Sequence, residues 1–466
     1  MNPDDFRQWG YRFVDWIAEY LAHPERYAVL PNVKPGEILG ELPLHAPEAA
    51  ESFEVMLRDL DRVIVPGLTH WNHPSFFAYF PNTGSEPGIF GEMITAALNV
   101  NGMLWRTSPA ATELEERVLD WLRELLGLPA DFRGMIFDTA SMSTFHALAA
   151  ARETITERRV RDDGIAGPGS PVLRMYASEQ AHSSVEKSAM ALGIGRRGLV
   201  KIAADSEFRM DVQALETAIE RDLREGFRPF AVVATVGTTS TTSIDPVARI
   251  ADVCAKHNLW LHVDAAYAGS AAIVPELRHI LEGCERADSF VTNPHKWLLT
   301  PMDLSAFYCR RLEMLRRAFS LTPEYLKTAK GESNAMEYTL QLGRRFRALK
   351  LWMVMRHYGV EGLRATIREH IRLAKLFASL VESDARFEVV APVPFSTVCF
   401  RLKAGDAETQ ALIDRVNASG KIFISHTRLN DKLTARLAIG NARTHEEHVR
   451  AAWEIIRGGP SPTGRG

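Results

Sequence analysis

The sequence predicts an α/β protein built around a mostly parallel sheet. Between about residues 86 and 320, short apolar segments alternate with stretches of helical periodicity, which is typical of β-α-β units. We expect strands at residues 134–137, 172–177, 230–235, 259–263 and 289–292. Helical stretches such as 141–158 and 184–193 lie between them. Ligands of parallel sheets bind at the carboxyl ends of the strands, so polar residues that follow these segments are candidates for a functional site.

Segments of a different kind flank this region. Residues 4–21 carry apolar side chains at helical spacing, and a second helix is expected near 51–64. The wide apolar face of this helical part would be exposed in isolation, so we expect it to pack on another body such as a second subunit. After residue 350 the pattern is a helix, then strands at 386–390, 397–402 and 433–439, then a helix near 445–457. We therefore predict a helical dimerisation domain (1–85), a large cofactor-binding domain (86–349) and a small α+β domain (350–466).

Composition excludes several classes of protein. Of 466 residues, 46% are hydrophobic and 24% charged, and the formal net charge is −3, so a nucleic-acid partner is not expected. Neither a run of about 18 apolar residues nor the apolar segment of a secretory signal is present, so no membrane partner is expected. The four cysteines are scattered without a Cys-x-x-Cys pair, which indicates a reducing, cytoplasmic setting without disulfides or a structural zinc.

Two polar residues stand at strand ends thirty-two positions apart. Asp264 follows the apolar run 259–263, and Lys296 follows the segment 288–295. A lysine that forms a Schiff base with pyridoxal phosphate, and a carboxylate that pairs with its pyridinium nitrogen, are the groups this cofactor requires. Taken singly, Asp264 could be a helix N-cap and Lys296 a surface lysine after a turn. The apolar Trp-Leu-Leu that follows Lys296 favours a partly desolvated, nucleophilic amine.

Two further stretches fit the same cofactor. Residues 138–144, Asp-Thr-Ala-Ser-Met-Ser-Thr, follow a predicted strand and open a helix, where hydroxyl and free N–H groups can bind phosphate. An ordinary helix cap is the alternative. His182 lies in a loop after another strand, and its ring could stack on a flat cofactor. Alone, a loop histidine often has no special role.

Several motifs in order resemble the group II pyridoxal-phosphate-dependent decarboxylases, and among these the aromatic L-amino-acid decarboxylases. They are Asn-Pro-His-Lys-Trp-Leu-Leu (293–299), His-Val-Asp-Ala-Ala-Tyr-Ala-Gly-Ser-Ala (262–271), Gln-Ala-His-Ser-Ser-Val-Glu (180–186), Leu-Gly-Arg-Arg-Phe-Arg-Ala-Leu-Lys (342–350) and the aromatic stretch 69–81. The resemblance covers nearly the whole chain. It implies the fold-type I, aspartate aminotransferase-like architecture with a mostly parallel seven-stranded sheet. It also implies a homodimer whose active sites are shared between subunits.

The resemblance assigns cofactor contacts residue by residue. Lys296 would be the Schiff-base lysine, Asp264 the partner of the ring nitrogen, His182 the stacking group and Ala266 the contact on the opposite face. The phosphate and the rest of the cofactor would be held by Thr139, Ala140, Ser141, Thr239, Asn293 and His295. Tyr325, in Pro-Glu-Tyr-Leu-Lys (323–327), matches the loop tyrosine thought to deliver the proton that completes decarboxylation.

The substrate pocket would draw on aromatic and small residues. It comprises Trp71, Tyr79, Phe80, Pro81, Asn82, Asn101, Met103 and Gly343, with residues 101–103 arriving from the other subunit. Compared with the animal enzymes, Asn82 replaces a threonine, Asn101 an isoleucine and Met103 a phenylalanine. Extra amides could favour a substrate with a polar group. Glycine at position 343 goes with indole substrates in related enzymes, so we expect tryptophan or a dopa-like substrate ahead of tyrosine or phenylalanine.

The sequence also departs from the family in its phosphate loop. Met142 stands where an acidic residue is usual, and the segment from Tyr325 to Gly343 is a few residues shorter than in the animal enzymes.

Other readings remain open at this point. Related aldehyde synthases resemble these enzymes but carry Phe in place of the loop tyrosine, or Asn in place of the stacking histidine. Tyr325 and His182 therefore favour amine over aldehyde as product. Decarboxylation of histidine, glutamate or methionine is another alternative. A pyridoxal-phosphate-binding protein without turnover is a further alternative, but such a protein would not need Lys296, Asp264, His182 and Tyr325 together. The pairs His70/His73 and His445/His448 do not match a His-Glu-x-x-His metal motif, so no metal is expected.

Overall fold

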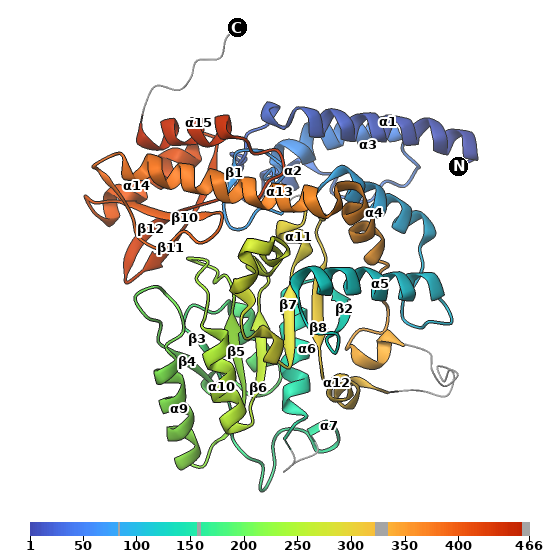
Figure 1. Cartoon of the computed structure of the whole chain (residues 1–466). Coiled ribbons are helices and arrows are strands. Elements are labelled where there is room, and N and C mark those ends of the chain that lie inside the picture. The colour runs from blue at the N-terminus through green and yellow to red at the C-terminus, as the bar shows by residue number, and fades with distance from the viewer. Residues whose placement is uncertain (83, 156–159, 322–333, 459–466) are drawn as a thin grey trace. The chain divides into compact units, whose positions relative to one another are not determined.

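The computed structural model describes residues 1–82, 84–155, 160–321 and 334–458, and Figure 1 shows the course of the chain. The chain divides into two compact units. Unit 1 comprises Met1–Pro81, Leu373–Val390 and Val398–Gly466, and unit 2 comprises Asn82–Arg372 and Ala391–Thr397. Unit 2 contains the central sheet, and we describe it first.

The sheet of unit 2 has seven strands in the order β2-β8-β7-β6-β5-β3-β4. Their bounds are β2 Arg133–Phe137, β3 Leu173–Ser178, β4 Leu199–Ile202, β5 Arg228–Thr235, β6 Trp260–Asp264, β7 Ser289–Thr292 and β8 Ser305–Cys309. Strand β8 is antiparallel to both of its neighbours, and the pairs β4–β3, β3–β5, β5–β6 and β6–β7 are parallel. The predicted mostly parallel seven-stranded sheet is confirmed. Because most strands point the same way, their carboxyl ends form one edge.

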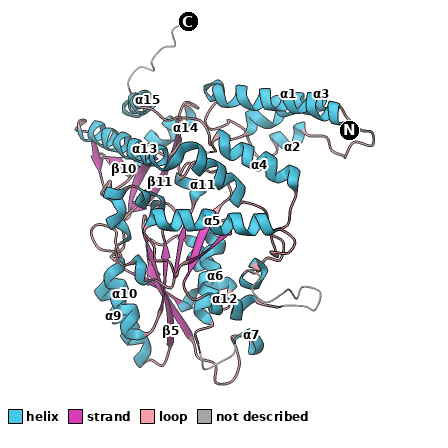
Figure 2. Cartoon of the chain, turned by 45° about the vertical axis from the view of Figure 1, so that its right-hand side comes forward, coloured by secondary structure: helices cyan, strands magenta, loops and turns pink. Residues whose placement is uncertain are grey.

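Helices cover both faces of this sheet. The helices of unit 2 are α4 Glu86–Leu98, α5 Pro109–Leu126, α6 Ala140–Arg152, α7 Val160–Asp163, α8 Ser183–Ala191, α9 Val212–Arg224, α10 Val247–His257, α11 Pro294–Trp297 and α12 Leu312–Phe319, and the long α13 Ala348–Glu382 begins in unit 2 and ends in unit 1. Short 3-10 turns lie at Arg196–Gly198, Ala268–Ile273, Pro275–Leu281, Cys284–Arg286 and Ala335–Tyr338. Figure 2 shows α9 and α10 on one side of the strands and α6 and α12 on the other.

Helix α6 packs closely on the sheet because it is rich in alanine. Residues 147–151, Ala-Leu-Ala-Ala-Ala, are at most 1% exposed and belong to a large apolar cluster with residues of β2, β3, β5, β6 and β8. Small side chains let the helix axis approach the strands, and the buried apolar surface stabilises the contact by about 25 cal/mol per Å². This packing fixes the start of α6 near the carboxyl edge of the sheet.

Unit 1 combines the N-terminal helices with a second sheet. Its helices are α1 Pro3–Ala22, α2 Glu37–Glu41, α3 Phe53–Asp59, α14 Asp406–Ala418 and α15 Glu446–Arg457, with 3-10 turns at Pro24–Arg26 and Val65–Gly67 and a π turn at Leu60–Ile64. The sheet order is β1-β11-β12-β10-β9, with bounds β1 Phe76–Phe77, β9 Phe387–Val389, β10 Thr397–Leu402, β11 Phe423–Leu429 and β12 Lys432–Ala438. Asn2 caps α1 by accepting the Asp5 N–H at 2.8 Å.

The predicted elements are largely found, with differences at the ends. The helix expected over 141–158 ends at Arg152, and the helix near 51–64 ends in a π turn. Strands β1, β4, β8 and β11 were not predicted. β1 and β4 are very short, and β8 and β11 lie between two neighbouring strands, where pairing decides the conformation. Over the residues that the structure describes, no helix is both long and apolar enough to span a membrane. The four cysteines are buried and none forms a disulfide. The three-domain division proposed from the sequence remains a prediction.

Candidate functional site

Asp264 and the segment that carries Lys296 follow neighbouring parallel strands. Asp264 is the last residue of β6 and pairs in register with Val291 of β7. Beyond the strands, the Asn293 N–H donates to the carbonyl of Ala266 at 3.0 Å. The Lys296 N–H donates to the carbonyl of Asn293 at 2.9 Å within the short helix α11. The carboxylate and the lysine are therefore delivered to the same edge by adjacent strands.

The Asp264 carboxylate is buried and needs a cation. The residue is 5% exposed, and its Oδ1 accepts the Ala266 N–H at 3.1 Å. A buried anion is stable only beside a positive charge or several hydrogen-bond donors. A protonated pyridine nitrogen would supply both a charge and an N–H. The surroundings of Asp264 thus fit the role expected for it.

His182 lies within electrostatic reach of both groups. Its side chain is exposed, yet the protein around it desolvates the ring and lowers its pKa; Asp264 raises that pKa and Lys296 lowers it further. The ring is oriented by Ser184, whose N–H donates to Nδ1 at 3.1 Å and whose Oγ lies 2.9 Å from Nδ1. A neutral, fixed imidazole at this position can lie against a flat ring.

The start of α6 presents backbone N–H groups at the same edge. Thr139 is the N-cap residue, but its side chain and N–H donate to Asp138 Oδ1 at 3.0 and 2.5 Å, and no side chain caps the helix. The first backbone N–H groups, those of Ala140 and Ser141, carry the partial positive charge of the helix end. Such an end binds phosphate well.

Two observations place this helix end beside the loops after β6 and β7. Ala140, Ala266 and Val291 form one buried apolar cluster. Asn293 is 2% exposed, and its side-chain Oδ1 has no hydrogen-bond partner among the described residues. A buried amide without a partner is costly, and a phosphate at the α6 N-terminus could satisfy it once the amide is oriented to donate. The residues present therefore fit pyridoxal phosphate.

The turn that carries Thr239 also approaches this edge. Gly237 has φ +87°, and a Cβ at this position would lie 2.5 Å from the Cβ of Ala268, so only glycine allows the approach. The N–H groups of Gly237 and Thr238 both donate to the carbonyl of Ser243 at 3.0 Å, which closes a tight turn. Thr239 itself is exposed at the tip of this turn.

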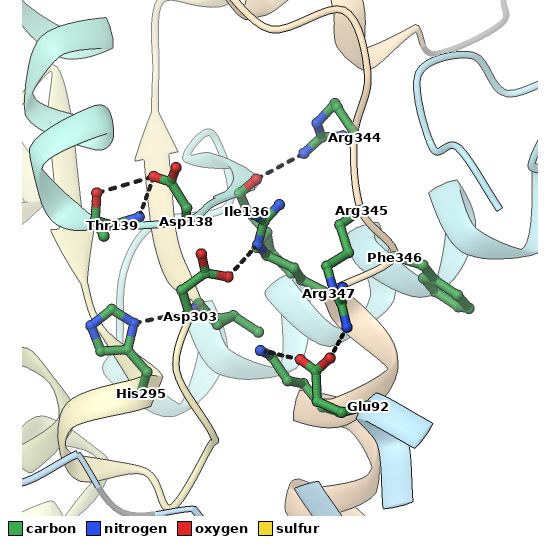
Figure 3. A network of polar contacts seen from close by, with 12 residues as sticks. Glu92, Ile136, Asp138, Thr139, His295, Asp303, Arg344, Arg345, Phe346 and Arg347 are labelled. Atoms are coloured by element: carbon green, nitrogen blue, oxygen red, sulfur yellow. Dashed lines mark hydrogen bonds and ion pairs between the residues drawn. The ribbon is translucent and has the colours of Figure 1, made fainter. Parts of the chain in front are cut away.

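His295, next to Lys296, faces the protein interior. Its Nδ1 accepts the Leu304 N–H at 2.9 Å, and burial, reinforced by the charge of Lys296, lowers its pKa to about 3. Figure 3 shows its ring near the Asp303–Arg347 ion pair (2.8 Å). A neutral His295 holds the backbone that follows Lys296 and adds no positive charge near the amine.

The predicted substrate residues fall into two groups, one in each unit. In unit 1, Trp71 stacks near Tyr79, with ring centroids 5.9 Å apart. Arg436 lies 4.8 Å over the ring of Phe80 and donates to the Tyr79 carbonyl at 2.9 Å. Pro81 packs against the backbone at Gly440. These contacts hold an aromatic strip in a defined conformation.

In unit 2, the polar side chains of the second group are engaged within the protein. Asn101 Oδ1 accepts the Arg344 N–H at 2.9 Å, and its Nδ2 contacts Met103 Sδ at 3.6 Å. Asn82 Nδ2 contacts Met302 Sδ at 3.3 Å. Sulfur is a weak acceptor, so each amide retains donor capacity that a polar substrate group could use.

The sequence of the site agrees with a known family. The family model described as "Pyridoxal-dependent decarboxylase conserved domain" matches residues 35–403. The chain belongs to the pyridoxal-dependent decarboxylases. The family resemblance, the pyridoxal-phosphate cofactor and the carboxy-lyase class inferred from the motifs are confirmed.

Relatives of this decarboxylase cover nearly its whole length. It is 44% identical to the aromatic-L-amino-acid decarboxylase of Sus scrofa, over 98% of this chain and 96% of that protein. It is 42% identical to the phenylacetaldehyde synthase of Arabidopsis thaliana, again over 98% and 96%. The crystal structure of Oryza sativa TDC with PLP and tryptamine superposes with a TM-score of 0.95 at 41% identity, covering 98% of both chains. The predicted fold-type I architecture is thereby confirmed.

Two sequence features of the decarboxylase can now be placed. Met142 is partly buried against the apolar cluster that holds α6 on the sheet, which accounts for an apolar residue at this position. Tyr325 lies outside the described residues, and its role stays a prediction.

Sequence reasoning missed several residues that shape this decarboxylase. Lys350 is 1% exposed and its Nζ forms an ion pair with Glu92 Oε1 at 2.5 Å; Arg345 pairs with the same carboxylate (Figure 3). The Arg344 guanidinium donates to Glu115 at 2.7 Å and to the carbonyl of Ile136 at 2.9 Å. The run 342–350 was noticed only as a motif. A lysine on an otherwise apolar helix face was the signal that could have identified Lys350.

The histidine pairs weighed as metal ligands are engaged within the protein. His70 Nδ1 lies 2.9 Å from the Tyr20 hydroxyl, and His73 Nδ1 accepts the Ser75 N–H at 2.9 Å. Elsewhere in the described chain, Glu216, Glu220 and His257 are close enough to share a cation. Lys256 already pairs with both of these carboxylates, at 2.6 and 3.3 Å.

Proposed function

We propose that this enzyme removes the carboxyl group of an aromatic L-amino acid and releases the corresponding amine and CO2. The observation that carries the proposal is the pairing of Asp264 and Lys296 at adjacent strand ends, tied by the Asn293–Ala266 hydrogen bond. The relatives named as aromatic-L-amino-acid decarboxylase and the solved TDC with tryptamine support an aromatic substrate.

Different residues of the site would bind different parts of the cofactor. Pyridoxal phosphate, when bound, supplies the electron sink that accepts the electron pair left on Cα as CO2 departs. Asp264 would keep the ring nitrogen protonated, because a buried carboxylate stabilises the adjacent cation. His182 would restrict the tilt of the ring. The α6 N-terminus, with Thr139, Ala140 and Ser141, would hold the phosphate together with Asn293.

Lys296 is placed to bind the cofactor and to exchange protons. It is half-buried, and burial keeps the adjacent His295 neutral. Partial desolvation favours a neutral, nucleophilic amine, so Lys296 would hold the resting cofactor and yield its place to the substrate amine.

The substrate contacts that we propose are those carried over by motif. Trp71, Tyr79, Phe80 and Pro81 offer apolar and aromatic surface suited to a planar ring. Asn82, Asn101, Met103 and Gly343 would line the remainder. Gly343 has no side chain to restrict the ring, which favours tryptophan or dopa over smaller substrates.

Tyr325 would supply the proton that Cα takes up after CO2 leaves. In this reaction one proton replaces the carboxyl group on Cα, and the product is the amine. Oxidative release of an aldehyde, with O2 consumed and ammonia and hydrogen peroxide formed, is the second candidate. The similarity to the relative named phenylacetaldehyde synthase is the reason to test for this oxidative reaction. Tyr325 and His182 favour the amine.

We further propose a cytoplasmic homodimer with shared active sites. Large apolar side chains are exposed in unit 1, among them Phe6 (69%), Tyr11 (65%), Leu39 (76%) and Leu44 (89%). Exposed apolar surface on this scale suits a partner. Asn101 and Gly343, both assigned to the substrate pocket, are exposed in the single chain, which suits cover from a second subunit.

The test is incubation of the pyridoxal-phosphate-loaded enzyme with a panel of amino acids, with and without oxygen. Amine, aldehyde, CO2 and peroxide are measured. We expect amine and CO2 in equal amounts, independent of oxygen, from tryptophan or dopa. Oxygen-dependent aldehyde with peroxide would contradict the proposal in favour of the synthase reaction, and turnover confined to histidine, glutamate or methionine would contradict the aromatic assignment.

A further inference from the structure

His146 is a fully buried histidine in α6, two turns after the helix start that is assigned to the phosphate. Its ring lies 4.2 Å from the ring of Phe137 and 4.8 Å from that of Phe319, measured between centroids. Burial lowers its pKa to about 4, so the ring is neutral near pH 7. None of the roles assigned above uses this side chain.

The hydrogen bonds of His146 determine its tautomer. Nδ1 lies 2.7 Å from the carbonyl of Met142, which can only accept, so Nδ1 carries the proton. Nε2 is then an acceptor, and it receives the Leu340 backbone N–H at 3.0 Å. The ring therefore connects α6 with a segment 194 residues further along the chain.

A second fixed point lies four residues beyond Leu340. The Arg344 N–H donates to Asn101 Oδ1 at 2.9 Å, and the Arg344 guanidinium donates to the carbonyl of Ile136 at 2.9 Å. The three residues between the two fixed points, Gln341, Leu342 and Gly343, have no side chain in the buried class. The Thr339 hydroxyl also donates to the Gln341 carbonyl at 2.7 Å, so the backbone is held on both sides of Gly343.

We propose that His146 is a positioning residue: by accepting the Leu340 N–H it holds Gly343 at the distance from Asn101 that selects the aromatic ring of the substrate. The inference rests on the proposed function and deepens it, because Gly343 matters only if an aromatic substrate binds beside it. His146 acts through the backbone and touches neither cofactor nor substrate.

Three substitutions separate the hydrogen bond from simple packing. His146→Gln places an amide oxygen where Nε2 lies, so it can still accept from Leu340. His146→Asn is shorter and can still donate to Met142, but its amide does not reach Leu340. Phe319→Leu removes a ring contact and leaves both hydrogen bonds, and serves as the packing control. Each is purified as the pyridoxal-phosphate-loaded enzyme.

Two readouts are compared with the unmodified enzyme. The first is the ratio of kcat/KM for tryptophan to that for phenylalanine, with kcat and KM resolved. The second is hydrogen exchange of backbone amides in residues 335–345, which needs no activity. For His146→Asn we expect the ratio to move about fivefold toward one, mainly through KM, and Leu340 to exchange about tenfold faster. For His146→Gln and Phe319→Leu, both the kcat/KM ratio and the exchange rate should stay within about twofold of the values for the unmodified enzyme.

The outcomes distinguish this inference from the proposed function. The inference would be overturned if His146→Asn left both the kcat/KM ratio and the exchange of Leu340 unchanged. It would also be overturned if His146→Gln changed these two quantities as much as His146→Asn does. If His146→Asn does not fold, Leu340→Pro removes the N–H from the other side; Thr339 is extended (φ −130°, ψ 150°), as a residue before proline requires. If the unmodified enzyme turns over no aromatic amino acid, the proposed function fails, and ring selection fails with it. Exchange then still reports whether His146 holds Leu340.

Discussion

The backbone N–H of Asn293 donates to the carbonyl of Ala266, and this bond joins the two loops that carry the proposed cofactor residues. One loop follows Asp264 and the other precedes Lys296. Because both residues of the bond are buried, the spacing between the carboxylate and the lysine is set by the backbone and not by side-chain rotamers. Loss of either side chain should then remove a chemical function and leave the fold intact.

Lys296→Ala should abolish covalent attachment of the cofactor. We expect the visible absorption of the lysine-bound cofactor to disappear, and kcat to fall by about three orders of magnitude or more. Absorption spectra and borohydride reduction followed by peptide mass analysis check this. Lys187→Ala changes an exposed lysine near His182 and is the control. Retention of a reducible cofactor adduct in Lys296→Ala would assign attachment to another lysine.

Asp264→Asn should preserve cofactor binding better than catalysis. The amide oxygen can still accept the Ala266 N–H, but no charge remains to keep a ring nitrogen protonated. We expect kcat to fall about 100-fold, which corresponds to about 3 kcal/mol, with a smaller change in the affinity for the cofactor. Steady-state kinetics and equilibrium dialysis measure the two. A kcat within threefold of the original would refute the pairing.

Tyr325→Phe should change the product. Without the hydroxyl, protonation of Cα slows and oxygen can react instead, so amine output falls while aldehyde, ammonia and peroxide rise. Product analysis in air and under nitrogen gives the ratio. In nitrogen the variant should be slow and should form no aldehyde. Undiminished amine with no aldehyde in air would mean that another group delivers the proton.

Gly343→Ser should shift preference from indole to phenol rings. A Cβ at position 343 lies 3.8 Å from Asn101 Nδ2, so a serine hydroxyl can both narrow the space and bond with this amide. We expect kcat/KM for tryptophan to fall about tenfold relative to tyrosine. Gly343→Ala adds the bulk without the hydroxyl and separates the two effects. Equal preference in all three enzymes would exclude position 343 from ring selection.

The stability of the protein should fall as the pH drops below about 6.5. His262 is fully buried, and burial lowers its pKa from 6.5 to about 4. The unfolded chain therefore binds the proton first, so the stabilisation is complete above pH 6.5 and is lost as the pH falls toward 4. The contribution is at most about 3 kcal/mol.

The matching measurement is urea unfolding from pH 7.5 to 5 for the original protein and for His262→Gln. The free energy of unfolding should fall less steeply with acid in the variant, although it starts lower because the Ser289 contact (2.9 Å) is altered. His426→Gln, at an exposed histidine, should leave the slope unchanged. Identical slopes for all three would show that His262 does not contribute to acid sensitivity.

The candidate site could be proposed from the sequence because its signals are local. Asp264 and Lys296 directly follow apolar strands, and a polar residue at such a point has few structural reasons to be there. The phosphate loop likewise follows β2 and opens α6. Helical periodicity similarly identified α1, whose observed bounds, Pro3–Ala22, lie within one residue of the prediction.

Other features could not be read from any window of sequence. Strand β8 forms because it pairs with β2 and β7. The paired residues Arg133 and Cys309 are 176 positions apart, and Thr292 and Ala306 are 14 positions apart. Its five residues would suit several conformations in isolation. The Lys350–Glu92 ion pair and the His146–Leu340 bond also join distant segments, and each side chain alone is an ordinary helical residue.

The sequence by itself determined the cofactor, because Lys296, Asp264 and His182 stand in motifs that can be recognised without a structure. It also determined the fold class, because hydrophobic periodicity is set residue by residue. Only the tertiary structure decided which neutral histidine tautomer His146 adopts, what partners hold Asn101 and Arg344, and where Gly343 is anchored. These depend on hydrogen bonds between groups far apart in the chain, whose geometry exists only after the helices and strands have packed.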